Sequence, residues 1–381
     1  MGNLGSMTIT GLSELTIVIP TVSRPLFILR QHEYWRDTDA RIVILDGASS
    51  PISIPSSLRS PNIQYIHTGT RFNERLATAS QYVNTKYCAL LPDDEFFLVS
   101  GLRAAIRRLE EDAAIVGCVG RNLYFFVDQQ RFLVRDAYRD WKPFSTNART
   151  LAARLDEDLP PNKTHKAQFA VMRSAEWKTM FESSYRQFFS CGYTYERLLN
   201  LQRTVSGRTE ILEDLLWMRS MENPPISSEN VPRVGGRDFV SWAKNPEFAG
   251  EVEHYREIAR KIIQDGGTSA TEASVFEERF FVGGVHRQAT KEVRNSKKWS
   301  HRFRKIAFFR TPKPLRLWAK RVLPDRLVRL TGWQGFDLDT MCESLASRGT
   351  QFSRIELDRV AELSLKLHHQ ANQQKVASHV G

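Results

Sequence analysis

The sequence LLPDDEFF occupies residues 90–97 and overlaps the apolar run YCALL at 87–91. Such a run is typical of a buried strand. Three adjacent carboxylates repel one another and are costly to desolvate, so Asp93, Asp94 and Glu95 are favoured where a divalent cation shares them. Their hard oxygen ligands suit Mg²⁺ or Mn²⁺. The stretch predicts a strand that ends at a site for a metal-bound diphosphate, and a plain acidic turn is the alternative.

Two earlier runs have the same form. They read LTIVIPTVSRP at residues 15–25 and RIVILDGASS at residues 41–50, and both pass abruptly from β-branched to polar residues, as buried parallel strands do. Residues 25–39 can hold a crossover helix, a third strand follows at 63–66, and a helix is predicted over 73–82. This alternation predicts an α/β fold in which helices cover a largely parallel sheet.

Polar residues stand where three of these strands end. Thr21, Ser23 and Arg24 follow the first strand, Asp46 follows the second, and the acidic cluster follows the fourth. Ligands of parallel α/β sheets bind beyond the carboxyl ends of the strands. The pattern therefore predicts one shared pocket.

In these three motifs the sequence resembles the nucleotide-sugar glycosyltransferases of the GT-A fold, close to the large family 2, over about residues 14–222. The resemblance implies a UDP-sugar donor, with Thr21, Ser23 and Arg24 lining the nucleotide pocket and Asp46 contacting uracil or ribose. Residues 93–95 would be the counterpart of the DXD motif that holds metal and diphosphate. The third acid is Glu and Pro92 precedes the pair, so the metal ligand is taken as Asp94, with Glu95 or Asp93 second.

A further acidic motif, TEILEDLLWMR, spans residues 209–219 and follows Gly207. Its apolar spacing predicts a helix, and acids in a first turn are favoured by the helix dipole. Family 2 enzymes that invert the anomeric centre carry a Glu-Asp pair at such a helix. The resemblance therefore implies Asp214 as the general base for the acceptor hydroxyl, with Glu213 as helper. Arg219 either pairs with the acids or is solvated.

Three weaker candidates complete the predicted site. Arg71 and Arg75 could neutralise diphosphate charge, or could belong to a solvated turn. A basic loop at 163–166 could face an acceptor or only water. His286 follows Gly283-Gly284, and some GT-A enzymes recruit a late histidine as an additional metal ligand; a structural or exposed histidine is the alternative.

The charge of the chain is concentrated in one segment. The 381 residues carry a formal charge of +11, and residues 297–329 contain twelve Lys or Arg against the single acid Asp325, so the remainder is neutral. Bulky apolar residues alternate with these cations, as interfacial membrane segments require. The segment predicts peripheral contact with anionic lipid and a lipid-linked or glycan acceptor. Nucleic-acid binding, a partner contact and a solvated basic face are the alternatives.

The rest of the sequence sets the domain plan. The four cysteines have no CxxC spacing, no apolar N-terminal segment precedes the first strand, and no run reaches about 18 apolar residues, which together favour a cytoplasmic protein. A catalytic domain is predicted at 8–235 and a mainly helical region at 236–381, with helices over about 245–264, 270–281 and 353–374.

Together with the resemblance, these observations predict a metal-dependent glycosyltransferase that uses Mn²⁺ or Mg²⁺. The resemblance also implies that it inverts the anomeric centre and acts in surface polysaccharide synthesis. A sugar-phosphate nucleotidyltransferase is one alternative, but the loop at 20–25 lacks the glycines that such an enzyme would want. The other is a non-catalytic scaffold that binds membranes or partners.

Overall fold

The computed structural model describes residues 10–128, 130–137, 146–158, 169–221, 239–297 and 335–380. Within them lies one sheet with the strand order β3-β2-β1-β4-β8-β6-β9-β5, in which β7 pairs with β6. The bounds of the strands are β1 Leu15–Thr21, β2 Arg41–Asp46, β3 Ile63–His67, β4 Tyr87–Leu90, β5 Phe96–Phe97, β6 Ile115–Asp128, β7 Arg131–Asp136, β8 Val171–Arg173 and β9 Arg208–Ser220.

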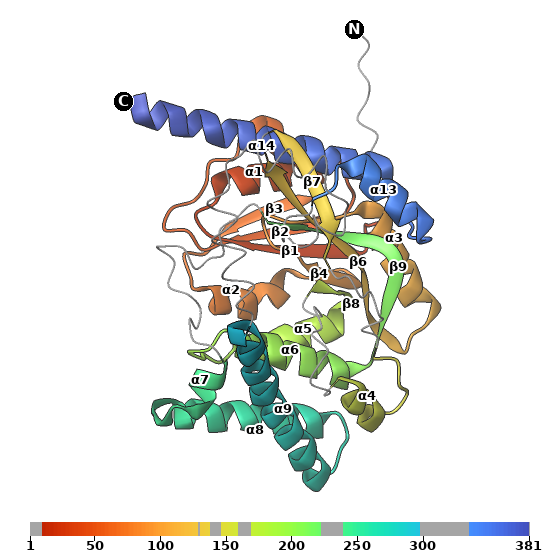
Figure 1. Cartoon of the computed structure of the whole chain (residues 1–381), viewed down its shortest axis with the longest axis vertical. Helices are drawn as coiled ribbons and strands as arrows, with labels where there is room; N and C mark the ends of the chain where they lie inside the picture. The colour runs from red at the N-terminus through yellow and green to blue at the C-terminus, as the bar shows by residue number, and fades with distance from the viewer. Residues whose placement is uncertain are drawn as a thin grey trace.

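The two halves of the sheet are built differently. β3, β2, β1 and β4 are parallel neighbours, as their apolar runs predict. β8 then joins β4 and β6 in antiparallel register, β9 runs parallel to β6, and the short β5 closes the edge antiparallel to β9. The predicted α/β class is confirmed, with a parallel half and a mixed half (Figure 1).

Helices cover both faces of the sheet, because successive strand residues point to opposite sides. Ile17 and Ile19 of β1 face a core shared with one set of helices, and Val18 faces the other core. The first set is α1 Pro25–Trp35, α3 Val99–Glu111, α13 Leu338–Ser347 and α14 Arg354–Val380. The second set is α2 Phe72–Thr78, α5 Ser174–Tyr185, α6 Tyr193–Ser206, α7 Phe239–Lys244, α8 Ala249–Asp265 and α9 Ala270–Lys297, and α4 Leu151–Asp158 lies against α6.

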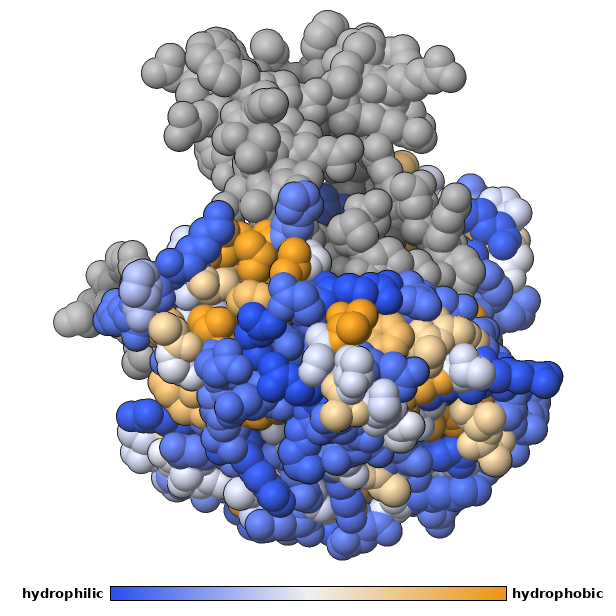
Figure 2. Space-filling view, turned by 90° about the horizontal axis from the view of Figure 1, so that it is seen from below, coloured by the Kyte–Doolittle hydropathy of each residue, from blue (hydrophilic) through white to orange (hydrophobic). Residues whose placement is uncertain are grey.

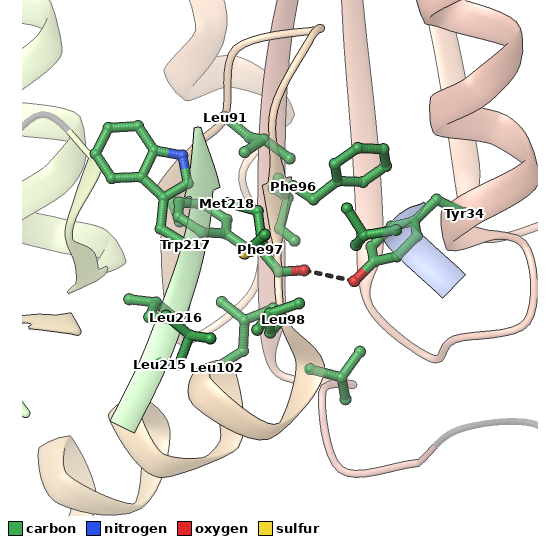
Figure 3. Packing of buried hydrophobic residues seen from close by; sticks show 14 of the residues in the cluster. Tyr34, Leu91, Phe96, Phe97, Leu98, Leu102, Leu215, Leu216, Trp217 and Met218 are labelled. Carbon is green, nitrogen blue, oxygen red and sulfur yellow. Dashed lines mark hydrogen bonds between the residues drawn. The ribbon is translucent and has the colours of Figure 1, made fainter. Parts of the chain in front are cut away.

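The helix predicted over residues 209–219 is wrong, because this segment is the strand β9. Four consecutive residues, Leu215 to Met218, are buried. One face of a helix does not bury four neighbours in a row, but a strand inside a covered sheet does. Figure 3 shows these residues packed with Phe96, Phe97 and Leu102, and the ring of Trp217 also lies 4.5 Å from that of Phe169.

The predictions for the C-terminal region hold in outline. Asn245 accepts a hydrogen bond from the backbone of Glu247 at 3.0 Å, and α8 follows the short helix η4 Pro246–Phe248 and ends before Gly266. α9 continues well past residue 281, where the sequence predicted its end, and α13 was not predicted. The outer surface of this lower layer is mostly hydrophilic, with separate hydrophobic patches (Figure 2).

Some predictions fall on residues outside the described ranges. These are the basic loop at 163–166, all but the first residue of the basic segment 297–329, and the domain boundary at 235, all of which stay predictions. Among the described residues, no helix is both long and apolar enough to cross a membrane. The four cysteines are free and buried, as expected for structural thiols.

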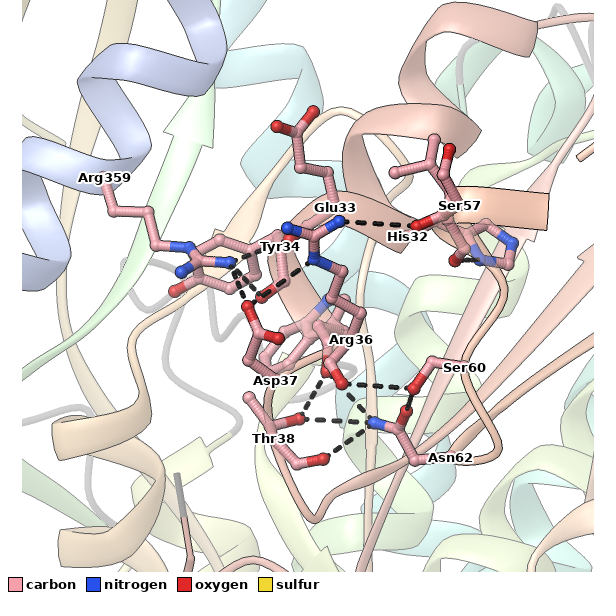
Figure 4. Close-up of polar contacts among 12 residues, drawn as sticks. His32, Glu33, Tyr34, Arg36, Asp37, Thr38, Ser57, Ser60, Asn62 and Arg359 are labelled. Atoms are coloured by element: carbon pink, nitrogen blue, oxygen red, sulfur yellow. Dashed lines mark hydrogen bonds and ion pairs between the residues drawn. The ribbon is translucent and has the colours of Figure 1, made fainter. Parts of the chain in front are cut away.

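A polar network fixes the end of α1 before the chain enters β2 (Figure 4). The side-chain amide of Asn62 donates to the carbonyl oxygens of Trp35, Thr38 and Ala40, each at 3.0 Å. One side chain thus ties the last carbonyl of α1 to two carbonyls of the connection that leads into β2. From the other side, Arg359 of α14 donates to the carbonyl of Glu33 at 2.8 Å, so α14 holds α1 in place.

The same C-terminal helix caps α3. Glu356 accepts hydrogen bonds from the backbone and the hydroxyl of Ser100 at 3.0 and 2.9 Å. We expect Glu356→Ala to lower the free energy of unfolding by about 1–3 kcal/mol, because a buried backbone donor loses its charged acceptor. Urea unfolding measures this. Glu362→Ala, on the exposed side of α14, is the matched control and should be neutral; equal losses in both variants would contradict the capping role.

Candidate functional site

The carboxyl ends of β1 and β2 lie side by side. Thr21 is in register with Asp46, and the backbone of Gly47 donates to the carbonyl of Thr21 at 3.0 Å. β4 pairs with the other side of β1 and leads directly into the acidic cluster. The three strand ends singled out by the sequence therefore meet at one edge of the sheet.

Asp93 is the centre of this edge. It is 3% exposed, and both its carboxylate oxygens are engaged: Thr21 Oγ1 donates to Oδ2 at 2.6 Å and Arg24 Nη1 donates to Oδ1 at 2.6 Å. Ser23, at φ 53°, adopts the left-handed conformation that non-glycine residues rarely take. This turn places Arg24 at the start of α1, facing the acid.

Two side chains of α1 hold the backbone of the acidic cluster. Gln31 donates to the carbonyls of Asp93 and Glu95 at 2.9 and 2.8 Å, and Arg30 donates to the carbonyl of Asp94 at 2.7 Å. Buried carbonyls need such donors. α1 thereby fixes the backbone of all three acids, a role that its sequence does not indicate.

Burial raises the pKa of Asp93 to about 6, and the negative charge of Asp94 adds to this, although the Arg24 guanidinium and the Thr21 hydroxyl act in the opposite direction. A carboxyl whose folded-state pKa lies above its unfolded value stabilises the fold below the unfolded pKa, and this stability is lost as the pH rises through about 6.

We therefore expect Asp93→Asn, which cannot ionise, to gain stability relative to the natural protein as the pH rises. Between pH 4 and pH 7.5 the relative gain should be about 2 kcal/mol, the value of a shift of nearly two pKa units. Urea unfolding of both proteins at the two pH values measures it. A difference in stability that does not change with pH would show that Asp93 titrates normally.

Asp46 is fully buried and organises the neighbouring loop. Its Oδ2 accepts from the hydroxyl of Tyr65 at 2.6 Å and its Oδ1 from the backbone of Ala48 at 2.9 Å. Desolvation, with the hydrogen bond to Asp46 as the second cause, raises the pKa of Tyr65 to about 12. The phenol is thus a donor at neutral pH, and it fixes the carboxylate at the strand end.

Of the two predicted arginines, the structure places Arg75 beside this turn. A Cβ on Gly47 would overlap its guanidinium, which donates to the carbonyl of Thr70. Burial lowers the pKa of Arg75, while nearby Asp46 partly offsets this. Arg71 is exposed at the N-cap of α2, where Glu74 accepts from its backbone at 3.1 Å.

The donor set fits a metal held by few protein ligands. Among the residues that the structure describes, no group of three or more His, Cys, Asp or Glu side chains is placed to hold a cation. Mg²⁺ needs only one or two carboxylates when phosphates and waters complete its shell. Asp94 suits this role because it is partly exposed, whereas Asp93 is engaged by Thr21 and Arg24. Glu95 is buried, with Arg219 Nε 3.8 Å from its carboxylate.

The structure does not bring Glu213 and Asp214 to this cluster. It is Arg219, at the far end of β9, that approaches Glu95, and Glu213 lies roughly 20 Å earlier on an extended strand. Glu213 instead accepts a hydrogen bond from Arg121 of β6 at 2.7 Å. The pair lies on a strand and not in the first turn of a helix, so the expected helix context is absent and the role of Asp214 as base stays a prediction.

The structure places His286 within a helix. α9 runs through Gly283 and Gly284, and the histidine is exposed on its surface. The glycine pair serves packing, since a Cβ on Gly284 would overlap the guanidinium of Arg197 in α6. The role of His286 as an additional metal ligand stays untested.

No protein-family model matches the sequence, and neither does any curated protein. Solved structures of S. aureus TarS are similar in fold. The fragment 1–349 in complex with UDP-GlcNAc is 10% identical, covers 95% of this chain and 92% of that chain, and gives a TM-score of 0.46. Its complex with UDP gives 0.44 with the same identity and coverage, and a longer TarS structure gives 0.37 at 12% identity over 68% of this chain and 44% of that chain.

These similarities concern the arrangement of strands and helices and not individual residues.

Proposed function

We propose that this protein is a glycosyltransferase that takes a sugar from a nucleoside diphosphate donor, in particular a UDP-sugar, and transfers it to a hydroxyl of a glycan or lipid-linked acceptor. The observation that carries the proposal is the meeting of Thr21, Arg24, Asp46 and Asp93 at one edge of the sheet, beside the partly exposed Asp94. Basic and acidic groups at the ends of parallel strands are suited to a ligand that contains both phosphates and a cation.

The residues divide by chemistry. Asp46 is buried and fixed by Tyr65, so it would shape the turn after β2 against which a nucleoside could bind. Arg24 can reach phosphate oxygens without leaving Asp93, since a guanidinium carries five donors. Asp94 would hold the divalent cation, which offsets the charge of the leaving diphosphate when bound. Arg71, exposed at the start of α2, adds a further positive charge at this edge.

Calorimetry with UDP, UDP-GlcNAc and other UDP-sugars, with and without Mn²⁺, tests the proposal. We expect micromolar to millimolar binding that needs the metal and is weakened at least about tenfold in Tyr65→Phe, which releases Asp46. GDP- and CDP-sugars form the comparison set. If no nucleotide binds, either with or without Mn²⁺, the glycosyltransferase proposal fails and a scaffold function takes its place.

A further inference from the structure

Two exposed aromatic side chains stand in one short segment. In the part of the chain that the structure describes, the exposed large hydrophobic side chains are Phe188, Tyr193, Met221, Val275, Val282 and Ile355. The two aromatic ones, 56% and 51% exposed, both lie between the end of α5 and the first residue of α6. Large apolar side chains that a fold leaves uncovered often mark a binding surface.

The topology brings this segment to the edge that carries the candidate site. β8 is antiparallel to β4, so it ends at the opposite edge and α5 runs back towards the carboxyl ends of the parallel strands. There the ring of Tyr185, the last residue of α5, packs against Phe72 at 6.0 Å. Phe72 follows Arg71 and begins α2, whose Arg75 reaches the turn after Asp46 (Figure 1).

The backbone under the two rings is held firmly. Glu251 of α8 accepts from the backbone and the hydroxyl of Ser190 at 2.9 and 2.8 Å, and from the indole of Trp242 at 3.0 Å. The hydroxyl of Tyr195 accepts from the backbone of Phe189, whose own ring is buried. Phe188 and Tyr193 are thus outward-facing rings on a fixed support, which lowers the entropy lost when a ligand binds.

We propose that Phe188 and Tyr193 form a stacking platform for a saccharide unit of the acceptor. This inference rests on the proposed function. A pyranose ring presents a face of C–H groups that packs on an aromatic face, while its hydroxyls need polar neighbours. The segment offers both, since the exposed Arg186 and the half-buried Gln187 directly precede Phe188. Residues 186–194 contain no aliphatic side chain, which a lipid tail would require for a continuous apolar surface.

The test uses the full chain on an array of defined oligosaccharides, in the presence of UDP and Mn²⁺. The double variant Phe188→Ala/Tyr193→Ala should bind glycans at least about tenfold more weakly, since both aromatic faces that the sugar would pack on are removed. Phe188→Tyr/Tyr193→Phe keeps both rings and should retain binding. Ile355→Ala removes an exposed side chain of α14, 82% exposed, and is the matched control.

Two further readouts separate the outcomes. Calorimetric UDP affinity should be unchanged in the double variant. If UDP fails to bind any of the proteins while glycans still bind through the rings, the proposed donor function fails and the rings keep a glycan-binding role without an acceptor role. Equal glycan binding by the natural and double-variant proteins, or no glycan retained by the natural protein, overturns the inference. If the double variant loses binding to phosphatidylglycerol vesicles but keeps binding to glycans, the rings contact a lipid surface and the inference is overturned.

Discussion

Asp94→Asn should lower sugar transfer at least about a hundredfold and leave the fold intact, once a donor and an acceptor are known. The amide keeps the shape of the side chain but loses the charge that would hold the cation at the diphosphate, and electrostatic stabilisation of a leaving group has this magnitude in other enzymes. Asp94 is partly exposed and its backbone is held by Arg30, so the change should leave the free energy of unfolding within about 0.5 kcal/mol.

Initial rates at saturating Mn²⁺ and calorimetric UDP binding measure the two halves of this expectation. Asp265→Asn, at an exposed carboxylate that pairs with Lys261 in α8, is the matched control and should keep full activity. If Asp94→Asn transfers sugar at the natural rate, another group holds the cation, and Glu95 becomes the first residue to test.

Gly101→Ala should destabilise the protein by about 3 kcal/mol or more, enough to leave much of it insoluble. A Cβ at this position would lie 2.5 Å from the carbonyl oxygen of Leu215 and 2.6 Å from the Cα of Leu216. Both are backbone atoms of a strand inside the sheet, so neither can move away as a flexible side chain could. α3 must therefore move off β9, and the packing around Phe97 and Trp217 is lost with it.

Gly250→Ala is the matched control, because this glycine is also in a helix and a Cβ there would meet no atom within 4 Å. It should stabilise α8 by up to about 1 kcal/mol through helix propensity alone. Circular dichroism and urea unfolding of the two variants give the comparison. A soluble Gly101→Ala protein of natural stability would show that α3 packs on β9 less closely than the structure has it.

The parallel half of the fold could be predicted because its strands are uninterrupted apolar runs that end in polar residues. The acids at 93–95 could be found for a related reason. Three adjacent carboxylates after a buried strand repel one another and are costly to desolvate, so a binding role is favoured over a purely structural one. β9 was missed because its motif satisfies two patterns at once. The three acids of the motif, Glu210, Glu213 and Asp214, stand where a helix dipole would favour them. The segment is a strand because it pairs with β6, a contact that its own sequence does not reveal.

The residues that hold the acids were harder to find. Gln31 and Arg30 act on backbone carbonyls more than sixty residues away, and such contacts leave no periodic signal in a sequence. Tyr65 looked like an ordinary strand residue, although it fixes Asp46. The sequence allows Arg219 to pair with acids of its own segment, but in the structure it approaches Glu95.

The contact between α14 and α1 has a consequence for how the protein is made. Arg359 donates to a carbonyl of α1 from a position 326 residues later in the chain. During synthesis, all strands of the sheet leave the ribosome before Arg359 does, so α1 lacks this contact while the sheet can already form. Contacts of such long range slow folding. Because Gln31 and Arg30 on α1 hold the acidic cluster, we expect nucleotide binding to be among the last properties that a newly made chain acquires, after most of its secondary structure is in place.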